Sequence, residues 1–205
     1  MNTNRKVWAF GCSFTTGDGL SNPVPGMPNV LAYPQLVANH FGMTCMNKGK
    51  SGSSNKSIHH RIMNRFQGDE NDIVLVTWTY PHRSCILTDR EEETVISLHS
   101  AQSESPGNIS EAFYEHFYSD YESNFELNLR MHHAYQYLSS MNVRQIHIMY
   151  DLKLFRREKF NTTPVQTFDF KTIKNKHPLG EDGLHPGENA HTEYAATIIS
   201  KIQDI

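Results

Sequence analysis

The chain has 205 residues, of which 38% are hydrophobic and 20% are charged, which is typical of a globular protein. A chain of this length is expected to form a single domain with a sizeable core. Its 19 lysine and arginine residues stand against 22 acidic residues, for a net charge of −3 without any basic block, so neither nucleic acid nor an anionic membrane is expected as a partner.

The N-terminal segment is polar and leads into a short apolar run, VWAF, at residues 7 to 10. This run is too short for the core of a signal peptide, and no later stretch reaches the ~18 apolar residues of a membrane span. We therefore expect a cytoplasmic protein. The three cysteines, Cys12, Cys45 and Cys85, show no CxxC spacing, so we expect free thiols rather than a disulfide framework or a zinc site.

The run VWAF is expected to form a buried strand because it is short, apolar and bounded by Gly11. Ser13 follows in the stretch GCSFTTGDG. It would lie at the carboxyl end of that strand, where open α/β sheets bind ligands and carry out chemistry. Ser13 is therefore a candidate nucleophile, although a serine in such a position can also serve only as a turn residue or helix cap.

The next two elements are a helix and a short strand. Residues 30 to 42, VLAYPQLVANHFG, carry apolar residues at helical spacing and end on Gly42, which is typical of a helix C-cap. Residues 43 to 46 can form a short strand. A helix that follows one strand and precedes another is the pattern of a parallel α/β sheet.

A second helix and the clearest strand of the chain follow. Residues 57 to 66, SIHHRIMNRF, are amphipathic, and Ser54, Asn55 or Ser57 can cap them. Residues 72 to 78, DIVLVTW, are rich in β-branched residues and flanked by polar ones, which is the pattern of a strand buried on both faces.

The second half of the chain begins with a segment of different character. Residues 89 to 142 are charged and aromatic, with apolar residues at intervals of three and four, which predicts one or two long helices in an insertion beside or over the sheet. A strand is expected at 145 to 150, a short one near 165 to 168, and an amphipathic terminal helix at 188 to 205. The alternation predicts an α/β fold, with a central parallel sheet covered by helices on both faces.

The stretch GEDGLHPG, just before the terminal helix, contains Asp182 and His185. Its glycines and Pro186 indicate a loop. An imidazole can take a proton from a serine hydroxyl when a carboxylate binds its other ring nitrogen and fixes its tautomer. We therefore predict that Asp182 orients His185 and that His185 is the general base for Ser13. A turn-forming aspartate and a histidine that caps the last helix are the ordinary alternative.

Three blocks of the sequence, GCSFTTGDG, NKGKSGSSN and DGLHP, resemble blocks I, II and V of the SGNH hydrolases, the GDSL-like esterases. The resemblance implies a three-layer α/β/α sandwich of flavodoxin-like type. It also implies hydrolysis of acyl or acetyl esters of lipids, carbohydrates or small molecules. Position by position, Ser13 resembles the nucleophile, Asp182 and His185 the rest of the triad, and Gly52 the glycine whose N–H helps to form the oxyanion hole.

Two positions depart from the family pattern. Cys12 stands where the family usually has an aspartate before the serine. The third block, which often reads GxND, is replaced by VTWTYPHR at residues 76 to 83, which has no asparagine. Thr79 and Asn55 are the candidates for the missing oxyanion donor, whose loss typically costs about 10²- to 10³-fold in turnover. Arg83, which ends this block, could contact a substrate carboxylate or phosphate, although an ion pair within the protein is the ordinary role.

The expected reaction uses Ser13 as nucleophile, His185 as proton carrier and Asp182 as orienting group, with the N–H groups of Ser13 and Gly52 stabilising the oxyanion. Water then releases the acyl group. Two alternatives stay open. One is an acyltransferase on the same triad, in which an alcohol or sugar replaces water. The other is a non-catalytic binding or assembly protein that keeps the fold.

We expect no metal and no cofactor. The adjacent histidines at 59–60 and at 132–133 do not chelate by themselves, because neighbouring residues of a helix point in different directions. One cluster has the residue types of a hard-metal site, and it overlaps the predicted triad. Its members are Glu181, Asp182, His185 and His191.

Overall fold

The computed structural model describes residues 5–87, 93–96, 109–165 and 170–203. Its central layer is a parallel sheet with the strand order β2-β1-β3-β6, which confirms the predicted α/β fold class. The four strands are β1 (Lys6–Phe10), β2 (Thr44–Asn47), β3 (Ile73–Trp78) and β6 (Arg144–Met149).

The sheet is built around β3, whose six residues are all buried. It pairs with β1 on one side, where Leu75 lies opposite Ala9, and with β6 on the other, where Leu75 lies opposite Ile146. A strand covered on both faces needs apolar side chains pointing both ways. This is why β3 reads as a continuous apolar run and why the sequence located it so clearly.

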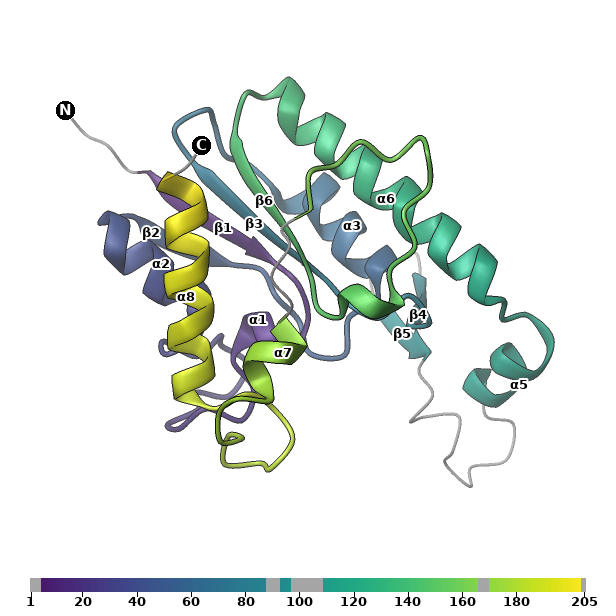
Figure 1. The fold of residues 1–205 in the computed structure, drawn as a ribbon, viewed down its shortest axis with the longest axis horizontal. Coiled ribbons are helices and arrows are strands. Elements are labelled where there is room, and N and C mark those ends of the chain that lie inside the picture. Colours follow the sequence, from purple (N-terminus) through teal and green to yellow (C-terminus); the bar gives the residue numbers. More distant parts are fainter. Residues whose placement is uncertain (1–4, 88–92, 97–108, 166–169, 204–205) are drawn as a thin grey trace.

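Two pairs of helices cover the two faces of the sheet (Figure 1). Helices α2 (Tyr33–Phe41) and α8 (Glu188–Gln203) pack together on one face. Helices α3 (Asn55–Arg65) and α6 (Asp120–Ser140) pack together on the other. The remaining elements are α1 (Ser13–Thr16), the hairpin β4 (Ser84–Leu87) and β5 (Glu93–Ile96), α5 (Ile109–His116), the 3₁₀ turn η1 (Leu152–Leu154) and α7 (Phe170–Lys174).

The side chains of β1 show how the two hydrophobic cores are divided. Val7 and Ala9 point into the core under α2 and α8, whereas Trp8 and Phe10 point into the core under α3 and α6. Successive side chains of a strand face opposite sides of the sheet. A four-residue apolar run therefore contributes equally to both cores.

The helix ends follow the expected capping chemistry. The hydroxyl of Ser54 accepts the N–H of Ser57 at 3.2 Å and caps α3, so Ser54 is the cap among the three candidates. Gly42 follows α2 with φ of +61°, a left-handed conformation that glycine adopts without steric cost. Both boundaries lie within a few residues of the predicted ones.

The segment between β3 and β6 differs from a plain helical insertion. It contains the antiparallel hairpin β4–β5, which helical periodicity did not predict, and the 21-residue helix α6. Helix α6 lies on the same face as α3 and leads into β6, so it is the crossover helix between two parallel strands. Residues 88–92 and 97–108 of this segment lie outside the described part of the chain.

The later elements agree in part with the sequence. Val165 forms an isolated parallel bridge with His147 at the edge of the sheet, and residues 166–168 of the expected short strand lie outside the described residues. The terminal helix is α8, described to residue 203. None of the described helices is both long and apolar enough to span a membrane.

Candidate active site

Ser13 lies at the carboxyl end of β1, where the chain turns into the short helix α1. Its carbonyl oxygen closes this turn by accepting the N–H groups of Gly17 at 2.9 Å and of Asp18 at 3.1 Å. The residue is only 6% exposed. Within the described part of the chain, its hydroxyl makes no hydrogen bond, so that oxygen is available to a substrate.

A chain of buried hydroxyls fixes this turn on the sheet. The Tyr33 hydroxyl lies 3.1 Å from the Thr15 hydroxyl and 2.6 Å from the Thr77 hydroxyl, and it connects α2, α1 and β3. Burial raises the pKa of Tyr33 well above its ordinary value, so the phenol stays protonated. Gly11 allows Thr15 to approach, because a Cβ at Gly11 would lie 2.0 Å from the Thr15 hydroxyl oxygen.

Asp182 and His185 form a close pair in the loop before α8. The Asp182 Oδ2 lies 2.5 Å from the His185 Nδ1, and its Oδ1 accepts the N–H groups of Leu184 and His185, both at 2.9 Å. Burial alone would raise the pKa of the Asp182 carboxyl, but these backbone N–H groups and the imidazole outweigh it and lower the pKa to about 2. The carboxyl group is therefore ionised at neutral pH.

The His185 ring is oriented by this carboxylate and open on its other side. Its side chain is 24% exposed, and that of Asp182 is 35% exposed. Among the described residues, nothing bonds to its Nε2 atom. A carboxylate on Nδ1 places the proton there and leaves Nε2 as an acceptor. In this arrangement Nε2 can accept a proton, as a general base does.

The loop of Ser13 and the turn of Asp182 and His185 pack against each other. The N–H of Glu181 donates to the carbonyl of Gly19 at 2.7 Å. Gly19 has φ of +81°, and a Cβ there would lie 2.7 Å from the Asp182 Oδ1, so only glycine fits. The ring of Phe14 meets the His185 ring edge to face, with centroids 5.7 Å apart. The imidazole thus contacts the neighbour of Ser13, and no direct Ser13–His185 hydrogen bond is present among the described residues.

Lys174, at the end of α7, also holds this turn. Its Nζ donates to the Leu184 carbonyl at 2.5 Å and lies 5.7 Å from the centroid of the Phe14 ring. The pKa of Lys174 is lowered, because the effect of burial exceeds the opposing effect of the nearby Asp182 carboxylate. Sequence reasoning missed this residue, because α7 has only five residues and lies in a stretch without clear periodicity.

Gly52 lies in the turn that precedes α3, with φ of +75°. This turn is fastened to the end of β1 by the N–H of Lys50, which donates to the Gly11 carbonyl at 3.2 Å, and is closed by the N–H of Ser53, which donates to the Lys50 carbonyl at 3.2 Å. Within the described part of the chain, the N–H of Gly52 donates to no acceptor. The role of this N–H as an oxyanion donor stays a prediction.

Asn55 does not have the free amide that we predicted. Its Nδ2 donates to the carbonyls of Thr79 at 3.2 Å and of Tyr80 at 3.1 Å, and its Oδ1 accepts the N–H of Thr79 at 2.8 Å. The residue is 4% exposed. Because both amide hydrogens already have acceptors, Asn55 clamps the loop after β3 to α3 and offers no spare donor, which corrects the prediction. Thr79 is also buried, and its hydroxyl lies 3.4 Å from the Arg83 Nη1.

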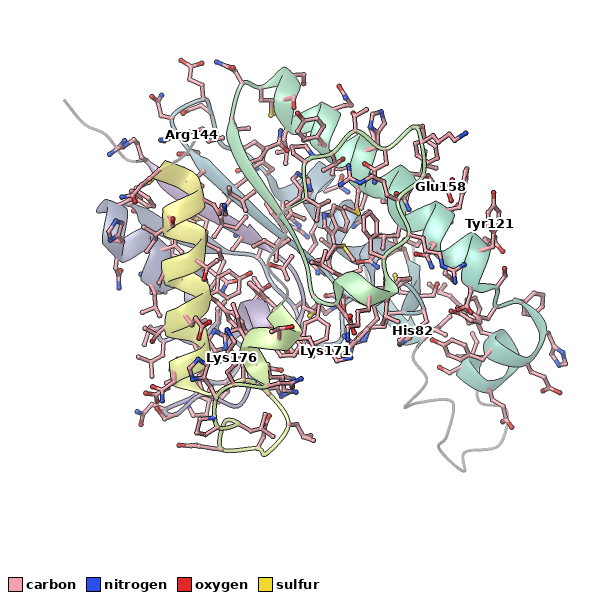
Figure 2. The ribbon with its side chains drawn as sticks, viewed as in Figure 1. His82, Tyr121, Arg144, Glu158, Lys171 and Lys176 are labelled. Carbon is pink, nitrogen blue, oxygen red and sulfur yellow. The ribbon has the colours of Figure 1, made fainter. Side chains whose placement is uncertain are left out.

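A row of aromatic rings runs along this end of the sheet. The centroid distances are 4.6 Å from Phe14 to Tyr150, 4.8 Å from Tyr150 to Tyr80, and 5.1 Å from Tyr80 to His82. His82 and Lys171 lie at this same end of the sheet in Figure 2. Because these rings come from three separate segments, no local pattern in the sequence predicts that they stack.

A hollow of about 750 Å³ borders the Asp182 side of the site. Asp18 lies in it, with its carboxylate accepting the hydroxyls of Thr16 and Ser51 at 2.6 Å each. Gly19 and Asp182 form part of the same wall. The hollow therefore offers space beside the Asp182 carboxylate, although neither Ser13 nor His185 belongs to its lining.

The histidines considered as metal ligands take other roles. His59 Nε2 lies 2.9 Å from His133 Nδ1 across α3 and α6, and burial lowers the pKa of His59 to about 4. His191 points into the core, where its Nδ1 accepts the N–H of Tyr33 at 3.1 Å. Over the described residues, no three histidine, cysteine, aspartate or glutamate side chains gather as a metal site would require.

The similarity of this chain to known proteins lies in its fold and not in its sequence. No protein-family profile matches the sequence, and no curated protein sequence matches it. Solved structures do match. A lipolytic protein of the G-D-S-L family from Desulfitobacterium hafniense DCB-2 superposes with a TM-score of 0.57 at 13% identity, over 97% of this chain and 99% of that chain.

Two esterases of known structure match over similar lengths. The psychrotrophic esterase EstA from Pseudoalteromonas sp., in a form inhibited by monoethylphosphonate, has a TM-score of 0.56 at 9% identity, over 98% of this chain and 97% of its own. A catalytic serine-to-alanine mutant of the acetylxylan esterase Axe2 from Geobacillus stearothermophilus has a TM-score of 0.54 at 14% identity, over 98% and 95%.

Proposed function

We propose that this chain, which has the fold of the SGNH hydrolases, is a serine esterase whose nucleophile is Ser13. The observation that carries the proposal is the 2.5 Å contact between Asp182 and His185, whose ring packs edge to face against Phe14, the residue after Ser13. A carboxylate, an imidazole and a serine with a free hydroxyl are the groups that acyl transfer requires.

The reaction follows from the roles of these groups. The Ser13 oxygen attacks the ester carbonyl carbon while His185 Nε2 takes the hydroxyl proton, and the carbonyl oxygen becomes an oxyanion. His185 then gives that proton to the leaving alcohol as the carbon–oxygen bond breaks, which leaves an acyl group on Ser13. Water attacks this acyl group, His185 takes a proton from the water and returns it to Ser13, and the acid departs.

Two backbone donors are available for the oxyanion. The N–H groups of Ser13 and Gly52 have no acceptor within the described residues, whereas the amide of Asn55 is fully used. A hole with two donors stabilises the oxyanion less than one with three, and each donor is worth about 10²- to 10³-fold in turnover. We therefore expect slower turnover than in esterases that have a third donor.

The neighbours in the fold support these assignments. Serine-to-alanine and histidine-to-alanine variants of the Geobacillus enzyme are both catalytic mutants, and that enzyme is an acetylxylan esterase. The proposed substrates of this chain are acyl or acetyl esters of small molecules or carbohydrates. The residues that carry the chemistry need no metal or cofactor, because every proton and charge in the reaction has a partner in the protein.

The test is hydrolysis of p-nitrophenyl esters from acetate to octanoate by the wild type, Ser13→Ala and His185→Ala, with fluorophosphonate labelling read by mass spectrometry. We expect turnover by the wild type, a label on Ser13, and a fall of about 10³-fold or more in both variants, because triad members act as a unit. Ser140→Ala, at an exposed hydroxyl at the end of α6, is the matched control and should keep full activity.

Each alternative gives a different result. A wild type that neither labels nor exceeds its variants would remove the esterase proposal and favour a non-catalytic binding protein. An acyltransferase would show normal labelling, but most of the acyl group would pass to an added alcohol rather than to water. The ratio of ester to free acid among the products measures this partition.

A further inference from the structure

Arg83, in the loop after β3, has the surroundings of a ligand-binding cation. Its guanidinium carbon lies 5.3 Å from the centroid of the Tyr80 ring, and its Nη1 lies 3.4 Å from the Thr79 hydroxyl. The side chain is half-buried. No carboxylate of the described residues lies within ion-pair distance of it, so none of them forms the ion pair that the sequence suggests as the ordinary role.

Arg83 lines a hollow of about 390 Å³ between the start of α3 and the helices α5 and α6. Lys56, which faces the same hollow, also has no ion-pair partner in the described structure. Arg130 is neutralised by Glu126 one helical turn away, and Glu122 is exposed. Outside the Arg130–Glu126 pair, the described charged residues of the lining are therefore two cations, Arg83 and Lys56, and one carboxylate, Glu122, so that cations outnumber carboxylates.

The apolar part of this hollow comes from helix α5 and its end. Phe113 and Phe117 contribute rings to the wall, and Phe117 is among the most exposed large side chains of the protein. Cations beside aromatic rings form a site that suits a ligand with both a negative charge and an apolar part.

The wall of the hollow is linked to the proposed reaction centre through neighbouring residues and side-chain contacts. Asn55 belongs to its wall and lies three residues after Gly52, the proposed oxyanion donor. On the other side, the ring of Tyr80 under Arg83 contacts Tyr150, and Tyr150 contacts Phe14. These ring contacts connect the surroundings of Arg83 with the residue next to Ser13.

We propose that Arg83, assisted by Lys56, binds an anionic group of the substrate, a carboxylate or a phosphate, so that the enzyme prefers negatively charged esters. This inference rests on the proposed esterase function and names its substrate class. A half-buried cation without a partner is costly, and a bound anion removes that cost. The guanidinium offers two parallel N–H groups that match either anion, and the Tyr80 ring restrains its plane.

The test uses ester pairs that differ in charge but not in length. Mono-4-nitrophenyl adipate carries a carboxylate, its methyl ester is neutral, and a phosphonate of the same chain length distinguishes the two kinds of anion. We expect the wild type to favour one or both anionic esters about tenfold or more in kcat/KM. Arg83→Gln should lose about 10- to 100-fold on the anionic ester and less than about threefold on the neutral one.

Two further variants distinguish a loss of anion binding from misfolding and from the loss of a purely catalytic role. Arg83→Lys, which keeps the charge but not the fork, should recover part of the preference, and Lys56→Gln should lose a smaller part of it. If Arg83→Gln slows both esters equally, Arg83 stabilises the oxyanion instead and the inference is wrong. If the wild type shows no preference for either anion, it is wrong as well.

A binding experiment separates this inference from the proposed function. Calorimetric titration of Ser13→Ala with monomethyl adipate should give binding that is lost in the double variant Ser13→Ala, Arg83→Gln. If no ester is hydrolysed but this binding is present, the esterase proposal fails and the anion site stands. If esters are hydrolysed but no binding depends on Arg83, the anion site fails and the esterase stands.

Discussion

The two ends of the central sheet each hold an aspartate beside an aromatic ring, but the two carboxylates are used differently. At the amino end, Asp72 is 4% exposed, and its oxygens accept the N–H of Lys6 at 2.7 Å and the indole N–H of Trp8 at 2.9 Å. At the carboxyl end, Asp182 is partly exposed and binds His185, whose other nitrogen is open.

The difference shows how to separate structural polar groups from functional ones in this fold. Around Asp72, donors and acceptors within the protein satisfy one another, so the network contributes to stability and has nothing left for a ligand. Around Asp182 the network ends at the other ring nitrogen of His185, which has no hydrogen-bond partner among the described residues. Asn55 belongs with Asp72 in this respect, although it lies next to the site.

The largest expected effect is on activity at the carboxyl end. Asp182→Asn should lower kcat about 10²- to 10⁴-fold, because an amide cannot fix the imidazole tautomer or stabilise its protonated form. The melting temperature should stay within a few degrees, because the amide oxygen can still accept the N–H groups of Leu184 and His185. Ester hydrolysis and thermal unfolding of the same samples check this, and a large parallel fall in stability would contradict it.

The converse is expected at the amino end. Asp72→Ala leaves the N–H of Lys6 and the indole N–H of Trp8 without acceptors in a buried place, which should cost about 2 to 4 kcal/mol of unfolding free energy. The kcat/KM of the folded protein should not change. Urea unfolding and ester hydrolysis measure the two quantities. Asp72→Asn keeps one acceptor oxygen and should lose less stability than the alanine variant.

A smaller effect on both quantities is expected where the two loops of the site touch. Gly19→Ala places a Cβ against Asp182 at a position with positive φ, and should cost about 1 to 3 kcal/mol in stability. Displacement of the carboxylate should lower kcat about tenfold or more. Gly26→Ala is the matched control, since Gly26 also has positive φ but nothing within 4 Å of the added Cβ. Its activity should remain unchanged.

The smallest effect is a gradual loss of stability in acid. Burial lowers the pKa of His147 to about 3, and burial together with the charge of His185 lowers that of His191 to about 4, from an ordinary 6.5. Between pH 6.5 and about 4, these two histidines bind protons in the unfolded chain but stay largely neutral in the folded chain. The free energy of unfolding is therefore highest above pH 6.5 and falls as the pH drops toward 4. Melting temperatures at pH 7, 6 and 5 should decrease in order, and His147→Gln should flatten the decrease.

The fold was largely predictable because its signals are local. The run at 72 to 78 is apolar on both faces, and Gly42 ends its helix as expected. The hairpin β4–β5 was missed because its strands have four residues each. A period of two cannot be recognised reliably over so few positions. Each of these strands is also held by pairing with the other strand, and the local periodicity of a sequence contains no information about such pairing.

Only the parts of the site that belong to short sequence motifs were predictable. Asp182 and His185 lie three residues apart and were expected to interact, which they do. The role of Asn55 could not be read from its residue type, because an asparagine amide suits an oxyanion and a backbone clamp equally well. The aromatic row and the unpaired Arg83 depend on which side chains the topology brings together, and no single stretch of sequence contains that information.

The hydrogen bond between Glu181 and Gly19 joins the beginning of the fold to its end, and this has a consequence during synthesis. During synthesis, Ser13 leaves the ribosome before His185, which lies directly before α8. A growing chain folds from its N-terminal part onward. On the proposed function, a nascent or truncated chain that ends before His185 carries the nucleophile without its base, so esterase activity should arise only after the turn of Asp182 and His185 has been made and has packed against Gly19.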